Sequence, residues 1–339
     1  MNKFSANFSR WKKERGRVLR RVMWPFSKFF IFLCKRLSLN SIYRLGSSIG
    51  RATYYMAFSH RKIALDSLSV AFPEVSLKRR KKIARDFSVI MVQSFLEVIH
   101  FASNYSLFNN IEIEGREFLN KALEKNQGVI ALSAHFGNFP LISLKLAREG
   151  YKINVVVRPM RDGDVEDYAQ DLRTKAGVNT IYSLPRGQCV ANMIKSLRNN
   201  EIVIIHMDQN FGTTGVWVKF FGRLAATPVG PVVLALRTNA PILPMFIIRE
   251  GIGKHRLKIL PELKLDYFPE RGKTILINTI KITKLIEEWV KRYPELWGWI
   301  HKRWKSRPSE EVIKEKFRIQ TDEIDEELLS IEGYVKDLR

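Results

Sequence analysis

The sequence predicts an α/β protein with a mostly parallel central sheet flanked by helices and a helical amino-terminal arm. Two observations support this class. After about residue 108, short apolar runs of strand length alternate with longer amphipathic segments, which is typical of parallel sheets covered by helices. Between residues 41 and 108, apolar side chains recur at helical spacing instead. A chain of 339 residues is long enough to bury one large core.

The arm is predicted as consecutive helices. Ile42, Leu45 and Ile49 share one helical face, and a similar pattern runs through residues 63–70. The turn at residues 72–74 contains a proline and interrupts this pattern. A further helix is expected from Leu77 to His100.

The remaining elements follow in alternation. Strands are predicted over 128–132, 152–157, 201–206, 242–248 and 255–260. Helices are predicted over 139–148, 164–175, 187–197, 228–238 and 283–293. We therefore divide the chain into a basic and apolar segment (1–40), a helical region (41–110), an α/β core (111–308) and a charged tail (309–339).

The charge of the chain predicts an anionic partner. Lys and Arg number 57 against 34 Asp and Glu, a net charge of +23. Residues 1–21 hold eight of these cations, with Phe4, Phe8 and Trp11 on one helical face. The apolar run 22–34 that follows is short for a membrane span, which takes about 20 residues. Residues 1–34 are expected to bind an anionic membrane surface; the alternative is a core helix with a solvated basic face.

Several classes of protein are excluded. The chain contains no recognisable nucleic-acid-binding module, so nucleic acid is not the expected partner. Cys34 and Cys189 have neither disulfide-framework nor metal-site spacing and are expected to be buried apolar residues. Nucleotide-binding glycine motifs and the nucleophile elbow of serine hydrolases are also absent. We expect neither a metal nor a cofactor.

His135 is the strongest candidate for a catalytic base. It lies in the turn Ser133-Ala-His-Phe-Gly-Asn-Phe-Pro140, directly after an apolar strand and before a helix. Open α/β sheets place their sites at the carboxyl ends of strands, and imidazole transfers protons near neutral pH. The alternative is a turn histidine that satisfies local hydrogen bonds.

Three further segments bring polar residues to the same edge. Arg158 ends a strand and could stabilise an oxyanion or form a surface salt bridge. Asp208 follows another strand and could orient groups on this edge or belong to an Asx turn. The stretch 294–308 interleaves aromatic and basic residues, which suits phosphorylated lipid head groups; the alternative is packed tryptophans with solvated charges.

Residues 40–308 resemble the bacterial lipid A late acyltransferases, within the wider lysophospholipid acyltransferase superfamily. The resemblance rests on the order and spacing of short motifs, namely 63–73, His135-Phe-Gly-Asn138, Arg158-Pro159, Asp208-Gln209, 220–222, 226–231, Ala235-Leu-Arg237 and 299–308. It implies a glycerol-phosphate-acyltransferase-like fold at the cytoplasmic face of a bacterial inner membrane. It also implies transfer of a fatty acyl chain from acyl carrier protein or acyl-CoA to a hydroxyl of a phosphorylated lipid acceptor.

The resemblance also implies roles for individual residues. His135, Arg158 and Asp208 are the expected catalytic residues. The expected substrate-binding residues are Asn138, Gln209, Arg237, His301, Arg303 and Lys305.

Pro140 departs from the family pattern. Family members carry Asp or Glu five positions after the histidine, where this chain has proline. Another carboxylate, with Asp208 the leading candidate, could replace that acid; His135 could act alone at a reduced rate; or the protein could be an inactive lipid-binding relative. We favour the working enzyme, because His135, Arg158 and the basic ending are retained. Proline also suits the first turn of a helix.

Overall fold

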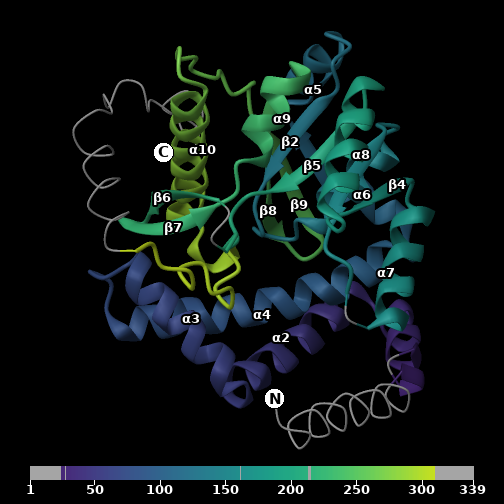
Figure 1. Cartoon of the computed structure of the whole chain (residues 1–339). Coiled ribbons are helices and arrows are strands. Elements are labelled where there is room, and N and C mark those ends of the chain that lie inside the picture. Colours follow the sequence, from purple (N-terminus) through teal and green to yellow (C-terminus); the bar gives the residue numbers. More distant parts are fainter. Residues whose placement is uncertain (1–23, 27, 161, 213–214, 310–339) are drawn as a thin grey trace, which may run out of the picture.

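The computed structural model describes residues 24–309, except 27, 161 and 213–214. The predicted arm consists of three helices, which lie together across the bottom of Figure 1: α2 (Leu39–Met56), α3 (Phe58–Ala71) and α4 (Leu77–Phe101). Ser38 caps α2 and Ser76 caps α4, each by accepting a hydrogen bond from a backbone N–H three residues on. Gly50 lets α2 approach α4 closely, since a Cβ there would lie 2.5 Å from the Cα of Val89.

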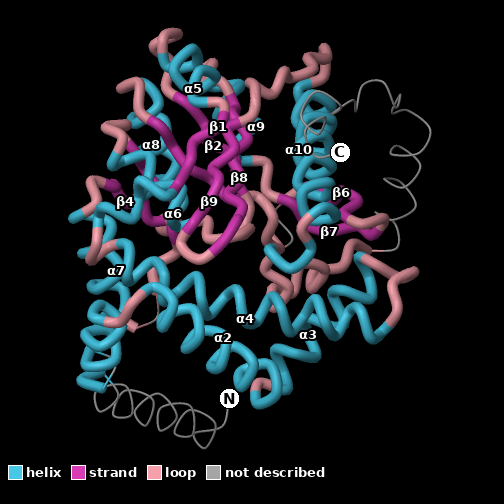
Figure 2. The backbone as a smooth tube through the Cα atoms, turned by 180° about the vertical axis from the view of Figure 1, so that it is seen from behind, coloured by secondary structure: helices cyan, strands magenta, loops and turns pink. Residues whose placement is uncertain are grey.

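The α/β part is built on a seven-stranded sheet in the order β1-β9-β8-β2-β5-β3-β4, with a separate hairpin of β6 and β7. The strands are β1 (Ile111–Glu114), β2 (Val129–Ser133), β3 (Ile153–Val157), β4 (Val178–Tyr182), β5 (Ile202–His206), β6 (Val216–Phe220), β7 (Arg223–Thr227), β8 (Ile242–Gly251) and β9 (Lys254–Ile259). The other helices are α5 (Arg116–Leu123), α6 (Pro140–Arg148), α7 (Gly163–Lys175), α8 (Arg186–Arg198), α9 (Gly230–Thr238) and α10 (Arg271–Arg292), with 3₁₀ turns η1 (Tyr105–Asn110) and η2 (Pro294–Leu296). Figure 2 shows this sheet from behind, with helices on both sides.

The sheet is mostly parallel, as predicted, and one hairpin breaks the pattern. β8 and β9 pair antiparallel, and β1 pairs parallel with β9. β9 and β1 therefore run against the direction that β2, β3, β4, β5 and β8 share.

Strand β2 separates two apolar layers. All five of its residues are buried. Ile130 and Leu132 belong to the core cluster that includes residues of α8, α9 and α10, whereas Val129 and Ala131 belong to the cluster with residues of α5 and α6. A strand covered on both faces reads as a continuous apolar run, which explains why this strand could be predicted so clearly.

The predicted helix at 283–293 was much too short. Helix α10 begins at Arg271. Its first half was not predicted, because buried polar residues interrupt the apolar pattern there. Thr279 and Thr283 donate their hydroxyls to the carbonyls four residues earlier, and Asn278 pairs with the backbone of Asp266. The edge strands β1 and β4 and the β6–β7 hairpin were not predicted. The hairpin turns at Phe221 and Gly222, which both adopt positive φ.

Both cysteines are buried and free, as expected. Within the described ranges, no helix combines the length and apolarity that crossing a membrane requires. Residues 1–23 and 310–339 lie outside the described part of the chain, so most of the predicted basic segment and the charged tail do too. The division into four regions stays a prediction.

Candidate active site

Two neighbouring parallel strands bring His135 and Asp208 together. Strands β2 and β5 pair in register, with Ser133 opposite His206. His135 lies two residues beyond Ser133, and Asp208 lies two residues beyond His206. Because both strands end at the same level, the two side chains meet at the carboxyl edge of the sheet, where open α/β folds place their sites.

The Asp208 carboxylate is held by three donors. One oxygen, Oδ1, lies 2.9 Å from His135 Nδ1 and accepts the backbone N–H of His135 at 3.1 Å. The other, Oδ2, accepts the indole N–H of Trp297 at 2.8 Å. Since an ionised carboxylate only accepts, Nδ1 of His135 carries the proton and Nε2 is left with a free lone pair.

Charge favours the ionised form of Asp208. Burial opposes ionisation, but the charge and hydrogen bonds of His135 outweigh it and hold the pKa of Asp208 below its usual range. Asp208 is 4% exposed, so water screens this interaction poorly. The pair can stabilise a positive charge that forms on the imidazole when His135 takes up a proton.

Two other histidines surround the pair. The ring centroids of His206 and His301 lie 4.9 and 6.1 Å from that of His135. Burial, together with the charge of His135, lowers the pKa of His206 to about 3 and also lowers the pKa of His301. These two rings are therefore neutral near pH 7, and of the three histidines only His135 has a ring nitrogen within hydrogen-bond distance of the Asp208 carboxylate.

The loop that carries His135 is fixed by the segment after α10. Phe136 forms an antiparallel bridge with Trp297. Gly137 donates its backbone N–H to Leu296 at 2.8 Å, and Gly298 donates to the carbonyl of His135 at 3.1 Å. The segment 294–304 thus completes the site from a distant part of the chain.

Gly137 makes this loop possible. Its φ is +59°, and a Cβ at this position would lie 2.2 Å from the carbonyl oxygen of Ile247. We expect Gly137→Ala to lower the free energy of unfolding by about 1–3 kcal/mol and to reduce activity at least about tenfold, because the loop must shift. Gly187→Ala is the matched control, since a Cβ there meets nothing within 4 Å. Urea unfolding and turnover of both variants test this, and equal behaviour would contradict it.

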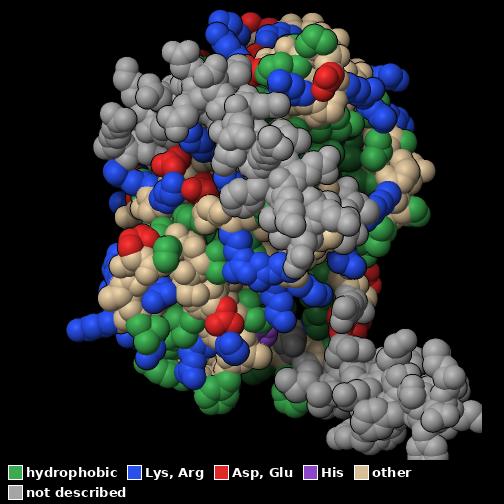
Figure 3. Space-filling view, turned by 60° about the vertical axis from the view of Figure 1, so that its left-hand side comes forward, with side chains coloured by type: hydrophobic (Ala, Val, Ile, Leu, Met, Phe, Trp, Pro, Cys, Tyr) green, Lys and Arg blue, Asp and Glu red, His purple; other side chains and the backbone are tan. Residues whose placement is uncertain are grey.

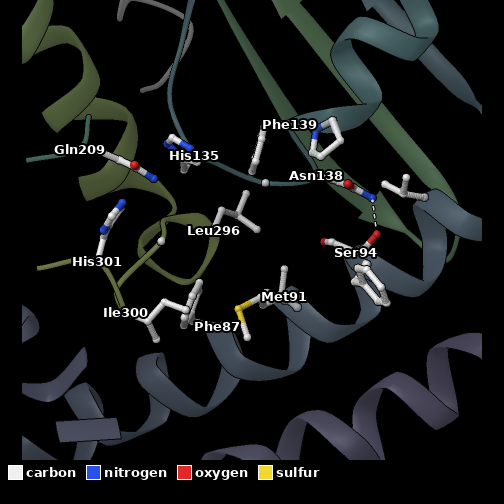
Figure 4. A pocket seen from close by; sticks show the side chains of 16 residues that line it. Phe87, Met91, Ser94, His135, Asn138, Phe139, Gln209, Leu296, Ile300 and His301 are labelled. Atoms are coloured by element: carbon white, nitrogen blue, oxygen red, sulfur yellow. Dashed lines mark hydrogen bonds between the residues drawn. The ribbon is translucent and has the colours of Figure 1, made fainter. Parts of the chain in front are cut away.

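A cavity of about 490 Å³ opens beside His135. Figure 4 shows His135, Gln209 and His301 at one end of this cavity. Apolar side chains of α4, such as Phe87 and Met91, form one of its walls. The lining residues are Phe87, Ile90, Met91, Ser94, Phe95, Val98, His135, Gly137, Asn138, Phe139, Pro140, Gln209, Leu296, Gly298, Ile300 and His301. The cavity is thus apolar with a proton-accepting group at one end.

Asn138 is tied to a buried ionic cluster behind the cavity. Glu97 on α4 is fully buried and accepts hydrogen bonds from Asn138 Nδ2 at 2.7 Å, His255 Nε2 at 2.9 Å, Arg249 Nη2 at 3.1 Å and the Tyr43 hydroxyl. Burial raises the pKa of Glu97, but His255 and Arg249 outweigh that effect and lower it to about 2. The cluster joins α2, α4, β8 and β9 to the loop of His135.

The other predicted site residues separate into two groups. Gln209 and His301 line the cavity. Arg158 follows β3 but is exposed and does not line the cavity. Arg237 is exposed in the last turn of α9, just before the amino end of β8 and therefore at the edge of the sheet opposite His135. Lys305 is exposed and lines a different pocket.

Arg303 and the tryptophans of 294–308 lie inside the protein. Arg303 is 1% exposed and donates to the carbonyl of Ala226 and the Thr227 hydroxyl. Trp297 and Trp299 are fully buried. The expectation that the aromatic residues of this segment face lipid was wrong for these side chains, because they complete the core around Asp208.

The α4 wall of the cavity was not predicted. Its residues follow the same helical pattern as any core helix, so spacing alone does not distinguish a cavity wall from a packed face.

Within the described residues, no cluster of three or more His, Cys, Asp or Glu could hold a metal ion.

Comparison with known proteins agrees with the resemblance noted in the sequence. The chain is 26% identical to a lipid A biosynthesis lauroyltransferase of Escherichia coli K12 over 283 residues, covering 82% of this chain and 90% of that protein. It is 24% identical to a lipid A biosynthesis myristoyltransferase of the same strain, covering 79% and 81%. A phosphatidylinositol mannoside acyltransferase of Mycobacterium tuberculosis H37Rv is 29% identical over 143 residues, 42% of this chain and 45% of that protein.

The family model of the bacterial lipid A biosynthesis acyltransferases matches residues 11–306. The match includes every element of the site, from α4 to the segment 294–304 that contacts Asp208 through Trp297. The chain therefore belongs to the bacterial lipid A biosynthesis acyltransferase family and is an acyltransferase.

Proposed function

We propose that this enzyme is a membrane-associated O-acyltransferase of lipid A synthesis, with His135 as its general base. His135 Nε2 removes the proton from a hydroxyl of a lipid A precursor, and the resulting oxygen nucleophile attacks the thioester carbonyl of the acyl donor. When the tetrahedral intermediate collapses, the carbon–sulfur bond breaks, an ester forms, and the proton passes from His135 to the leaving thiolate. Acyl carrier protein or acyl-CoA supplies the acyl chain.

The observation that carries this proposal is the His135–Asp208 pair at one end of an apolar cavity. A fatty acyl chain gains free energy by leaving water for walls such as Phe87, Met91 and Leu296. The thioester then lies at the polar end of the cavity, beside the base. Arg158 lies outside the cavity lining, and the backbone N–H groups of Leu141 and Ile142 in the first turn of α6 already donate to the carbonyls of Asn138 and Phe139, so none of these donors is assigned to the oxyanion.

Pro140 does not argue against catalysis. The inactive-relative hypothesis rested on the missing acid at this position, but the Asp208 carboxylate already contacts His135 Nδ1. Pro140 is the first residue of α6, where its missing N–H costs little. We therefore abandon that alternative.

The test of the proposed function is His135→Ala in the full chain. We expect transfer of a labelled acyl chain to lipid A precursors to fall to background, because His135 is the histidine of the described residues that is hydrogen-bonded to Asp208. His60→Ala is the matched control, since His60 is exposed on α3. Turnover by His135→Ala equal to that of His60→Ala would refute the role of His135.

We also propose that the helical residues 28–36, purple in Figure 1, dock on an anionic membrane surface. Residues 28–36 are helical and carry Lys28, Lys35 and Arg36 beside exposed Phe29 and Phe32. Phe29 is 61% exposed, which is costly in water but favourable at a lipid interface. The net charge of +23 favours anionic lipids and an acidic acyl carrier protein alike.

This membrane proposal makes a prediction about extraction. Phe29→Ser/Phe32→Ser should be released from membranes by about 1 M salt, whereas the unaltered protein should need detergent, because salt screens charge but leaves apolar burial intact. Tyr267→Ser is the control, as Tyr267 is 73% exposed but follows β9. Substitution is preferable to removing residues 1–39, which would delete the Ser38 cap of α2. Recovery of the unaltered protein in the soluble fraction would contradict the proposal.

A further inference from the structure

A second cavity, of about 410 Å³, lies between α3 and the segment that follows His301. Six cationic side chains line this cavity. One is the buried Arg303, and the other five are Lys62, Arg223, Lys302, Lys305 and Arg307. Figure 3 shows Lys and Arg side chains gathered in the middle of the face that comes forward from the left of Figure 1. We call the cavity the basic pocket.

Among the described residues, little negative charge balances the basic pocket. Asp66 is the carboxylate in its described lining, and it lies 2.9 Å from Lys62. No ion pair with a carboxylate of the described residues involves Arg223, Lys302, Lys305 or Arg307. Burial and the nearby charge of Arg307 lower the pKa of Arg223, as expected where cations crowd together. An anion entering this pocket would relieve that repulsion.

The frame of the basic pocket is rigid. Arg303 is buried and bonded to the carbonyl of Ala226 and the hydroxyl of Thr227, which ties the segment to the end of β7. Trp304 is 7% exposed and donates its indole N–H to the carbonyl of Phe220 at 3.2 Å. The cations at 302, 305 and 307 are therefore attached to a fixed backbone, so less ordering is needed when an anion binds.

The basic pocket adjoins the active site through one short piece of chain. His301 lines the cavity beside His135, and Lys302, the next residue, lines the basic pocket. Ile300 also lines the cavity beside His135, whereas Trp304 and Lys305 line the basic pocket. An acceptor that reached His135 with its hydroxyl would thus have this pocket beside it.

We propose that the basic pocket binds a phosphomonoester of the lipid acceptor and thereby positions the acceptor hydroxyl at His135. This inference rests on the proposed function and names the acceptor group that the enzyme recognises. A phosphomonoester carries about −1.5 to −2 charges near pH 7 and offers three acceptor oxygens, which suits several Lys and Arg donors around one hollow. A phosphodiester carries less charge and fewer free oxygens, and a carrier protein would need a broad surface rather than a cavity.

Binding without turnover tests the pocket. The full-length protein is titrated, without acyl donor, against neutral vesicles containing either phosphatidic acid, a phosphomonoester, or phosphatidylglycerol, a phosphodiester. We expect the unaltered protein to prefer phosphatidic acid by at least about tenfold, roughly 1.4 kcal/mol. Lys302→Gln/Lys305→Gln and Arg223→Gln/Arg307→Gln should each abolish that preference. Lys195→Gln/Arg198→Gln, which removes two exposed cations from α8, should retain it.

Three outcomes would overturn the proposal. The first is equal binding of both lipids by the unaltered protein, which would indicate a general anionic surface. The second is a preference for phosphatidic acid that survives in both pocket variants. The melting temperatures of these variants and of the control show whether each one is folded. The third is tight binding of inorganic phosphate with no preference between the vesicles, which would assign the pocket to free phosphate.

A kinetic measurement separates this inference from the proposed function. With a phosphorylated lipid A precursor, the pocket variants should raise KM for the acceptor about tenfold, and removal of the acceptor phosphate should raise the KM of the unaltered protein similarly. Loss of activity in His135→Ala together with unchanged KM in the pocket variants would refute the pocket and leave the reaction intact. Undiminished activity in His135→Ala would instead refute the proposed function.

Discussion

Asp208→Asn should lower the rate of acyl transfer by about 10³- to 10⁴-fold. Asparagine keeps the shape of the side chain, and its amide oxygen can still accept one of the three hydrogen bonds that Asp208 receives from His135 and Trp297. It carries no charge, so it no longer stabilises the imidazolium that forms when His135 takes a proton. Its amide NH₂ can also face His135 Nδ1 and favour the wrong tautomer.

Two comparisons isolate this effect. Asp171→Asn removes an exposed carboxylate that pairs with Lys175 on α7, and its turnover should be unchanged. Pro140→Glu restores the acid of the family pattern, yet it should raise the rate less than about twofold because Asp208 already occupies the Nδ1 side of His135. A large gain in Pro140→Glu, or near-normal turnover in Asp208→Asn, would show that Asp208 is not the partner of His135.

Glu97→Gln should lower the free energy of unfolding by about 3–5 kcal/mol, the range found when one member of a buried ion pair is removed. Glu97 is fully buried among His255, Arg249, Tyr43 and Asn138, and the amide cannot balance the charge of Arg249. Urea unfolding measures the change. Glu117→Gln is the control, since Glu117 is exposed on α5.

The same residue predicts an acid dependence. The pKa of Glu97 is lowered from 4.5 to about 2 in the folded protein, so its contribution to stability is present above pH 4.5 and is lost as the pH falls toward 2. Unfolding free energies measured across this window should fall less steeply in Glu97→Gln than in the unaltered protein. Equal slopes would indicate that Glu97 is not held ionised by its neighbours.

The sequence predicted those parts of the fold and site that depend on local pattern. The buried run of β2 and the turn after it identified His135, and Asp208 could be proposed as its partner because it follows another strand of the same sheet. The helices α2, α3 and α4 were visible in their apolar spacing. These features repeat every few residues and need no knowledge of distant contacts.

What the sequence could not give depends on long-range packing. Trp297 is distant from Asp208 in sequence, and its role as a donor appears only when the segment after α10 folds back on β2. Arg303 carries the same kind of charge as Lys305, yet it is buried and donates hydrogen bonds to β7, whereas Lys305 is exposed. The long α10 was missed because its buried Thr and Asn residues look polar until their partners are known.

The closure of the site by residues 294–304 bears on how the enzyme becomes active during its synthesis. A nascent chain that has emerged as far as Arg292 contains every strand of the sheet and both members of the His135–Asp208 pair. It still lacks Trp297, the bridge to Phe136 and the Arg303 anchor. His135 and Asp208 are therefore synthesised before the residues that hold them in place, and we expect acyltransferase activity to appear only after residues 294–304 have left the ribosome.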